Sequence, residues 1–177
     1  CAVKPTRLRR AAYFRSLGTG MELSRTFDIF ADYFQFILMD EGCDDDFGSV
    51  WTEEALERML AVGETSVCPG TLRNVNVPVE IHVHGAEPSV DPTGYDHAVL
   101  ASLQVPSGRL VVMGCTDHLP EAPRVELKAG SYQLLYLATG VESITYESDP
   151  ADDRYIVHLW PGSPREPVLL RHWRPRA

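Results

Sequence analysis

Short apolar stretches separated by turn-prone residues recur from position 65 to position 160, and this pattern constrains the fold more than any other feature. In the stretch 75–84, Val79, Ile81 and Val83 alternate with polar residues, which places them on one face of an extended strand. The separators are rich in Gly, Pro, Asp and Ser, which favour turns. We expect a mainly β protein, an antiparallel β-sandwich of about seven to nine strands. The strands expected in this part of the chain are residues 65–70, 75–84, 97–105, 109–115, 123–128, 131–139 and 154–160.

The aromatic segment 21–39 predicts two more strands. It is rich in aromatic and β-branched residues, which are enriched in strands. Phe34, Phe36 and Leu38 lie two residues apart and therefore share one face of a strand. We expect that face to be part of the core.

One short α-helix is expected within residues 50–63. Thr52 can cap its first turn, where two glutamates follow and the helix dipole favours negative charge. Gly63 would end the helix. Trp51 and Leu56 are predicted to form a hydrophobic staple at the start of the helix. Leu56, Met59 and Leu60 are predicted to form one apolar stripe along it.

Charge divides the chain into three parts. Residues 21–162 hold 24 acidic and 7 basic residues, a formal charge of −17, whereas the whole chain carries −9. We expect this stretch to be one acidic β-sandwich domain. Residues 1–20 hold five basic residues and no acidic one, and we expect a basic extension that is disordered or not native. Residues 163–177 are rich in Pro and Arg and predict an extended C-terminal tail.

The acidic body limits the class of partner. Negative charge repels nucleic-acid phosphates and anionic membranes, and it attracts basic proteins or cations. No apolar run reaches the ~18–20 residues that cross a bilayer. The four cysteines are widely spaced and form no CxxC pair, so we expect free thiols in a cytoplasmic protein rather than a zinc knuckle or a disulfide framework.

Seven acidic residues in and after the loop 40–48 are the candidates for partner contact. Clustered carboxylates can pair with Lys and Arg of a basic protein. Calcium is an alternative ligand of this loop, although the spacing lacks the Gly and Glu positions of an EF-hand. The candidate contact residues are Asp40, Glu41, Asp44, Asp45, Asp46, Glu53 and Glu54.

A His-x-His pair on an expected strand offers a metal or small-ligand site as the alternative function. His82 and His84 share one strand face, so both imidazoles can reach one divalent transition metal. The run HVHGAE resembles the first metal motif of the cupins, a β-barrel family, but Leu134 or Leu135 stands where their second motif has its histidine. The structural interpretation is a solvated strand face whose polar residues alternate with Val79, Ile81 and Val83, and on that interpretation we expect no cofactor. The alternative metal ligands are Glu80, His82, His84 and Glu87.

The motifs of common enzyme classes are missing from the sequence. It contains no G-x-S-x-G elbow, P-loop or dinucleotide fingerprint. Cys115, Asp117 and His118 are close in sequence, but neighbouring side chains at a strand end point apart and rarely converge as a triad. We therefore expect a binding protein and not an enzyme.

The order of these segments resembles the competence protein J family over residues 26–160. The resemblance begins with the strand DYFQFILMD and the helix WTEEALERM, and it continues through VCPGTLRNVNVPVEIHVH and HAVLASLQVPSGRLVVMG. It ends with the hairpin VELKAGSYQLLYL and the strand RYIVHLW. The family implies inhibition of a DNA-degrading nuclease that takes part in DNA uptake. The hypothesis is an acidic protein-binding module that inhibits or regulates a basic nuclease, with no direct contact to nucleic acid or membrane.

Overall fold

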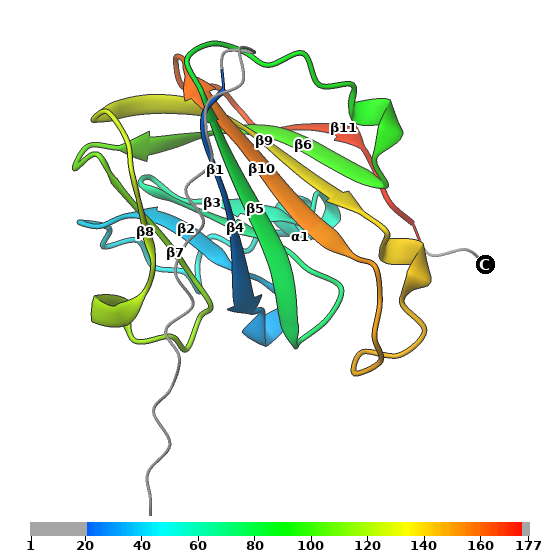
Figure 1. Ribbon diagram of the computed structural model, residues 1–177. Coiled ribbons are helices and arrows are strands. Elements are labelled where there is room, and N and C mark those ends of the chain that lie inside the picture. The colour runs from blue at the N-terminus through cyan, green and yellow to red at the C-terminus, as the bar shows by residue number, and fades with distance from the viewer. Residues whose placement is uncertain (1–20, 175–177) are drawn as a thin grey trace, which may run out of the picture.

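Two β-sheets pack face to face in the computed structural model, which describes residues 21–174 (Figure 1). Within that range the chain forms eleven strands and one short α-helix. The expected mainly β sandwich with one short helix is therefore confirmed. Every strand predicted from the sequence is present, and the two additional strands are β3 (Leu60–Val62) and β11 (Val168–Arg171).

The larger sheet has the strand order β1-β5-β10-β9-β6-β11. Its neighbours pair antiparallel except β5 and β10, which run parallel with Val157 opposite Ile81. A parallel pair needs a long crossover connection, and here the intervening chain includes β6 and β9 of the same sheet. The strands are β1 (Met21–Phe30), β5 (Asn76–His84), β6 (His97–Val105), β9 (Gly130–Thr139), β10 (Arg154–Pro161) and β11.

The smaller sheet is antiparallel throughout, with the order β3-β4-β2-β7-β8. Besides β3 it contains β2 (Ile37–Asp40), β4 (Ser66–Pro69), β7 (Arg109–Met113) and β8 (Arg124–Glu126). Four short 3-10 helices lie within the described loops: η1 (Asp32–Phe34), η2 (Pro92–Gly94), η3 (Leu119–Glu121) and η4 (Val141–Ser143).

A hydrophobic core fills the space between the sheets. The inward residues of the larger sheet, such as Ile81 and Leu134, are fully buried against those of the smaller one, such as Leu110. The buried ring of Phe36 meets the rings of Tyr136 and Tyr155 edge to face, with centroids 6.4 and 6.5 Å apart. Phe36 and Leu38 are thus in the core as predicted, but Phe34 is 47% exposed and that part of the prediction is wrong.

Each sheet also carries a smaller apolar cluster on its outer face. On the smaller sheet, α1 (Glu53–Glu57) and the segment 43–51 cover Ile37, Met39, Cys68 and Val111. On the larger sheet, Val90 and Tyr95 of the connection 85–96 pack with Leu135, Leu137, Ile156 and Trp160. Both connections are therefore fixed to the sheets by buried apolar contacts.

The helix is shorter than the sequence predicts. It ends where Met59 takes a left-handed φ of 50°, and Leu60 starts β3 instead of continuing an apolar stripe. Pairing with β4 buries Leu60 completely, a burial that a helix on the sheet surface would not give it. Leu56 is 63% exposed, so the predicted stripe and the predicted staple with Trp51 are both wrong.

The strand β11 comes from the stretch that was expected to be an extended tail. It pairs antiparallel with β6 at one edge of the larger sheet, with Val168 opposite Leu100. Two residues further on, Trp173 N donates to His97 Nδ1 at 3.2 Å. The expected basic extension at 1–20 lies outside the described residues, as do residues 175–177.

Candidate protein-binding surface

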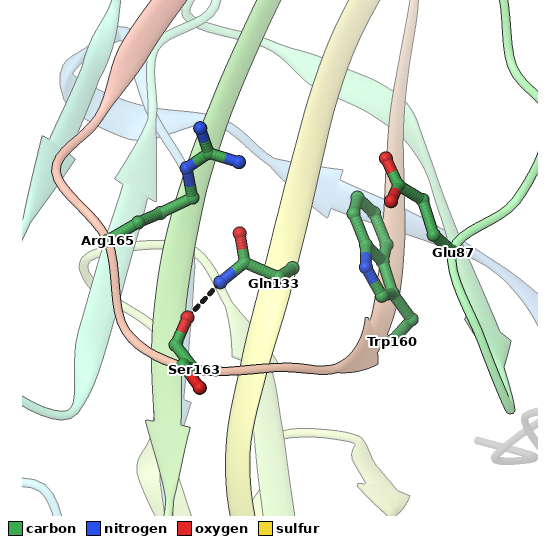
Figure 2. Close-up of a pocket in the computed structure, with 5 residues that line it drawn as sticks. All are labelled: Glu87, Gln133, Trp160, Ser163 and Arg165. Atoms are coloured by element: carbon green, nitrogen blue, oxygen red, sulfur yellow. Dashed lines mark hydrogen bonds between the residues drawn. The ribbon is translucent and has the colours of Figure 1, made fainter.

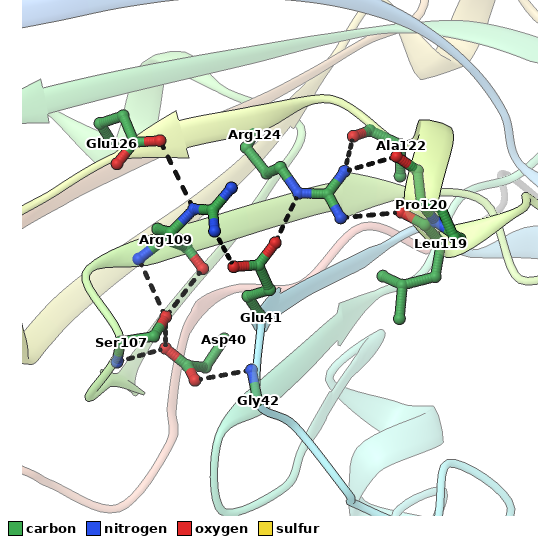
Figure 3. Close-up of polar contacts among 10 residues, drawn as sticks. All are labelled: Asp40, Glu41, Gly42, Ser107, Arg109, Leu119, Pro120, Ala122, Arg124 and Glu126. Atoms are coloured by element: carbon green, nitrogen blue, oxygen red, sulfur yellow. Dashed lines mark hydrogen bonds and ion pairs between the residues drawn. The ribbon is translucent and has the colours of Figure 1, made fainter.

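The carboxylate of Asp40 is used inside the fold. The residue is 2% exposed at the end of β2. Its Oδ1 accepts hydrogen bonds from the backbone N and the Oγ of Ser107, at 2.8 and 2.6 Å, and its Oδ2 accepts from Gly42 N at 2.9 Å (Figure 3). Asp40 therefore joins the acidic loop to the β6–β7 turn.

Glu41 also makes internal contacts, because two strands of the smaller sheet present arginines to it. Its carboxylate pairs with Arg109 of β7 and with Arg124 Nε of β8, the latter at 2.9 Å (Figure 3). Arg124 in turn donates to backbone carbonyls of the η3 region, including that of Leu119 at 2.9 Å. Glu41 is thus the centre of a partly exposed charge network that links β2, β7 and β8.

Asp45 folds back onto the turn between β3 and β4. Its Oδ2 accepts from Thr65 N at 3.0 Å and from Ser66 Oγ. Burial alone would raise the pKa of Asp45, but the hydrogen bonds from Ser66 and Thr65 outweigh it and hold the pKa below its usual value. A Cβ on Gly63 would lie 2.3 Å from this oxygen, so the close approach requires glycine there.

The other four candidates are exposed to solvent. Asp44 and Asp46 lie in the loop, where Asp46 Oδ1 accepts from Gly48 N at 3.0 Å in an Asx turn. The helix cap at Thr52 forms as predicted, since its Oγ1 accepts from Ala55 N at 3.2 Å. Glu53 and Glu54 follow in the first turn of α1, and both are exposed. We name the four exposed acids Asp44, Asp46, Glu53 and Glu54 the acidic surface. Glu57, which sequence reasoning did not select, is exposed on the same short helix.

An exposed aromatic turn lies at the end of β1. Phe30, Tyr33 and Phe34 are 44%, 72% and 47% exposed. The turn is joined to the helix start by the side chains of Gln35 and Trp51, whose Nε1 donates to Gln35 Oε1 at 2.7 Å. Sequence reasoning assigned these aromatic residues to strands, and alternation alone gave no signal that two of them would leave the sheet.

The His-x-His pair lies on the outer face of the larger sheet, where both rings stack on a third histidine instead of pointing toward a common metal position. The parallel pairing of β5 and β10 adds a third imidazole, His158, that sequence reasoning missed. The His158 ring stacks on His82 and His84 with centroids 4.9 and 5.1 Å apart, and His84 Nε2 lies 2.9 Å from His158 Nδ1. Glu80 faces His82 Nε2 at 3.3 Å. Among residues 21–174, no three His, Cys, Asp or Glu side chains are arranged to hold a metal ion.

Glu87, the fourth alternative ligand, lines a separate shallow pocket. This pocket, of about 290 Å³, lies over the larger sheet and is also lined by Gln133, Trp160, Ser163 and Arg165 (Figure 2). In Figure 2 Gln133 lies between Arg165 and Trp160, and its side chain points toward Ser163, to whose carbonyl its amide donates. The structure therefore does not bring Glu87 together with the histidines.

Cys115, Asp117 and His118 do not form a catalytic group. Asp117 Oδ2 accepts from Gly114 N at 2.8 Å, and His118 faces Glu121 at the surface at 3.6 Å. Burial, with the nearby carboxylate of Asp32, raises the pKa of the Cys115 thiol to about 11, which keeps it protonated at neutral pH. Within residues 21–174, no helix is long and apolar enough to cross a membrane.

Comparison with known proteins places the fold. No protein-family model and no curated protein matches this chain. Solved structures with the same fold include ComJ from Bacillus subtilis, an inhibitor of the DNA-degrading activity of NucA, at a TM-score of 0.59 and 19% identity over 79% of this chain and 96% of that one. They also include crocagin biosynthetic gene J, at a TM-score of 0.55 and 19% identity over 80% of this chain and 98% of that one. The resemblance to the competence protein J family is thus confirmed at the level of the fold.

Proposed function

We propose that this chain is a protein-binding module that inhibits or regulates a DNA-degrading nuclease and has no catalytic activity of its own. The observation that carries the proposal is the shared fold with ComJ, which extends over nearly all of that inhibitor. The residues considered for catalysis give independent support, because Cys115, Asp117 and His118 make separate contacts.

The charge of the domain suits a basic partner. A nuclease presents positive charge to the phosphates of DNA, and a body with a formal charge of −17 over residues 21–162 is attracted to the same surface. Attraction of this kind mainly speeds association and sets orientation. Bound there, exposed carboxylates occupy the positions of phosphate oxygens against Lys and Arg, and DNA is excluded.

The structure narrows which carboxylates can do this. Asp40, Glu41 and Asp45 make internal hydrogen bonds or ion pairs, so a partner would have to break those contacts to use them. The residues of the acidic surface are exposed, and the hydrogen bond from Gly48 N to Asp46 Oδ1 lies in an exposed turn, so a partner meets a smaller cost there. We therefore assign the electrostatic contact to Asp44, Asp46, Glu53 and Glu54.

The test is inhibition of purified nuclease at two salt concentrations. NucA and the DNA-degrading nucleases of the genome that encodes this chain serve as probes, with release of fluorescent DNA fragments as the readout. We expect inhibition at low salt that weakens at high salt, because mobile ions screen the attraction. Absence of binding and of inhibition with every one of these nucleases at low salt contradicts the proposal.

A matched pair of triple variants separates local contact from overall charge. Asp44→Asn, Glu53→Gln and Glu54→Gln neutralise exposed acids of the acidic surface. Glu87→Gln, Glu126→Gln and Glu166→Gln make the same change in net charge at exposed positions elsewhere. Only the first set is expected to reduce inhibition, by about tenfold, as is usual when several interface charges are lost.

No resident cofactor is proposed. The metal alternative at His82 and His84, and the calcium alternative at the loop 40–46, stay predictions. Elemental analysis of the purified protein checks the first. A melting temperature that rises with millimolar calcium would support the second.

A further inference from the structure

We propose that the aromatic turn, formed by Phe30, Tyr33 and Phe34, is the apolar anchor that docks this chain onto its basic protein partner. This inference rests on the proposed function and adds an apolar contact, with the acids around it, to the contact assigned to the acidic surface. It follows from three properties of the turn: exposure, backbone conformation and the charge around it.

The exposed aromatic side chains are held in an unfavourable backbone. Tyr33 and Phe34 have φ of 56° and 59°, in the left-handed region that bulky residues rarely adopt. In the part of the chain that the structure describes, the only other non-glycine residue with positive φ is Met59, at the end of α1. Strain of this kind persists where the surroundings enforce it, and it is concentrated at binding and catalytic sites.

The surroundings enforce the conformation through hydrogen bonds from three other segments. Asp32 is 6% exposed, and its Oδ1 accepts from Cys115 N at 2.6 Å. Thr71 N donates to Phe34 O at 2.7 Å. Further bonds join Ala31 N to Val75 O at 3.0 Å and Trp51 Nε1 to Gln35 Oε1 at 2.7 Å. The rings are thus displayed on a rigid support, so little conformational freedom remains to be lost on binding.

The segments around the turn supply negative charge. They are residues 28–34, 69–76, 114–121 and 140–153, and their single basic residue, Arg73, is buried against Asp153. The loop 140–153 is tied to the turn's neighbour, since Glu147 Oε1 accepts from Asn74 N at 3.2 Å. The exposed acids in these segments are Asp28, Asp117, Glu121, Glu142, Glu147, Asp149 and Asp152.

An aromatic centre with an acidic rim fits one class of partner, a basic protein with an apolar recess among its Lys and Arg residues. Interface energy is concentrated in a few central aromatic side chains that exclude water, while surrounding charges steer and orient. Exposed rings could also stack on nucleobases, but the acidic rim repels the phosphates that accompany them. The partner chemistry is therefore that of a nuclease surface rather than of its substrate.

The experiment measures the affinity of the full chain for NucA and for the nucleases of its own genome, by calorimetry at two salt concentrations. Tyr33→Asn and Phe34→Asn remove the ring while keeping a residue that tolerates positive φ. We expect each to weaken binding about tenfold or more, with an unchanged salt dependence. Tyr33→Phe keeps the ring and is expected to bind as the unchanged chain does. Leu170→Asn is the control. Leu170 is an apolar residue on β11 that is 44% exposed, close to the 47% of Phe34, and β1 with its turn lies at the opposite edge of the sheet.

The outcomes separate this inference from the proposed function. If the unchanged chain binds and inhibits a nuclease while the Tyr33 and Phe34 variants bind equally well, the inference is wrong and the proposed function stands. If the unchanged chain binds no nuclease, the proposed function fails and the inference fails with it. A homodimer in sedimentation that Tyr33→Asn dissociates would assign the turn to a second copy of this chain and overturn the inference.

Discussion

The acidic loop 40–46 and the aromatic turn at 30–34 both differ in exposure from what their compositions suggest. Three acids of the loop region, Asp40, Glu41 and Asp45, use their carboxylates in hydrogen bonds and ion pairs within the chain. The turn, made of residues typical of a core strand, directs Tyr33 and Phe34 into solvent. A cluster of acidic residues in the sequence therefore does not show that their carboxylates are exposed, because nearby backbone donors and arginines can bind them within the fold.

The largest expected effect is the loss of stability when Asp40, which is buried and hydrogen-bonded, is replaced. Asp40→Ala leaves Gly42 N, Ser107 N and Ser107 Oγ without their acceptor, and we expect the free energy of unfolding to fall by about 2–4 kcal/mol. Urea denaturation measures it. Asp44→Ala, an exposed neighbour in the same loop, serves as the control and should change stability by less than about 0.5 kcal/mol. Equal losses of stability in the two variants would show that the contacts of Asp40 within the fold do not set it apart from the exposed Asp44.

A smaller effect is expected on the opposite side of the sandwich, where the histidines stack. Burial, with His82 and His84 nearby, lowers the pKa of His158 from 6.5 to about 4, against the opposing influence of Glu80. The folded state then binds fewer protons than the unfolded state, so stability is lost as pH falls from 6.5 to about 4. Allowing for solvent screening of a partly exposed ring, the loss is on the order of 1–2 kcal/mol.

The measurement is urea denaturation at a series of pH values. His158→Gln should flatten the pH dependence in this range. His118→Gln, at an exposed position, should leave it as in the unchanged chain. A profile that His158→Gln does not alter would mean that other groups dominate the acid response.

The left-handed backbone of the aromatic turn predicts that one substitution there stabilises the protein. Tyr33→Asn places a residue that tolerates left-handed φ where Tyr33 now lies, and we expect the free energy of unfolding to rise by about 0.5–1 kcal/mol. The control is Tyr146→Asn, because Tyr146 is similarly exposed at 70% but has no positive φ. Thermal denaturation compares the two, and a destabilised Tyr33→Asn protein would mean that the ring contributes packing which outweighs the strain.

The exposed acids give the smallest change in stability. Asp44→Asn and Glu53→Gln should leave the free energy of unfolding within about 0.5 kcal/mol, because solvated surface charges contribute little. Their effect is expected in the rate of association with the nuclease and in its dependence on salt. Stopped-flow association at two salt concentrations checks this, and a large loss of stability would place these residues with Asp40.

The β-sandwich could be predicted from the sequence, because short apolar stretches separated by turn-prone residues are local signals that do not depend on contacts between distant segments. The cap at Thr52 was also predictable, because it joins residues three positions apart, and the alternation of residues 34–39 predicted the burial of Phe36 and Leu38.

The roles of particular side chains depend on contacts between segments that are distant in sequence. Met59 ended the helix and Leu60 became part of β3 because strand pairing with β4 gives complete burial. His158 came to lie beside His82 through a parallel pairing of strands distant in sequence. The two donors that Ser107 gives to Asp40, and the Cys115 amide that donates to Asp32 beside Tyr33, come from segments tens of residues away, and no local sequence pattern predicts contacts of that kind.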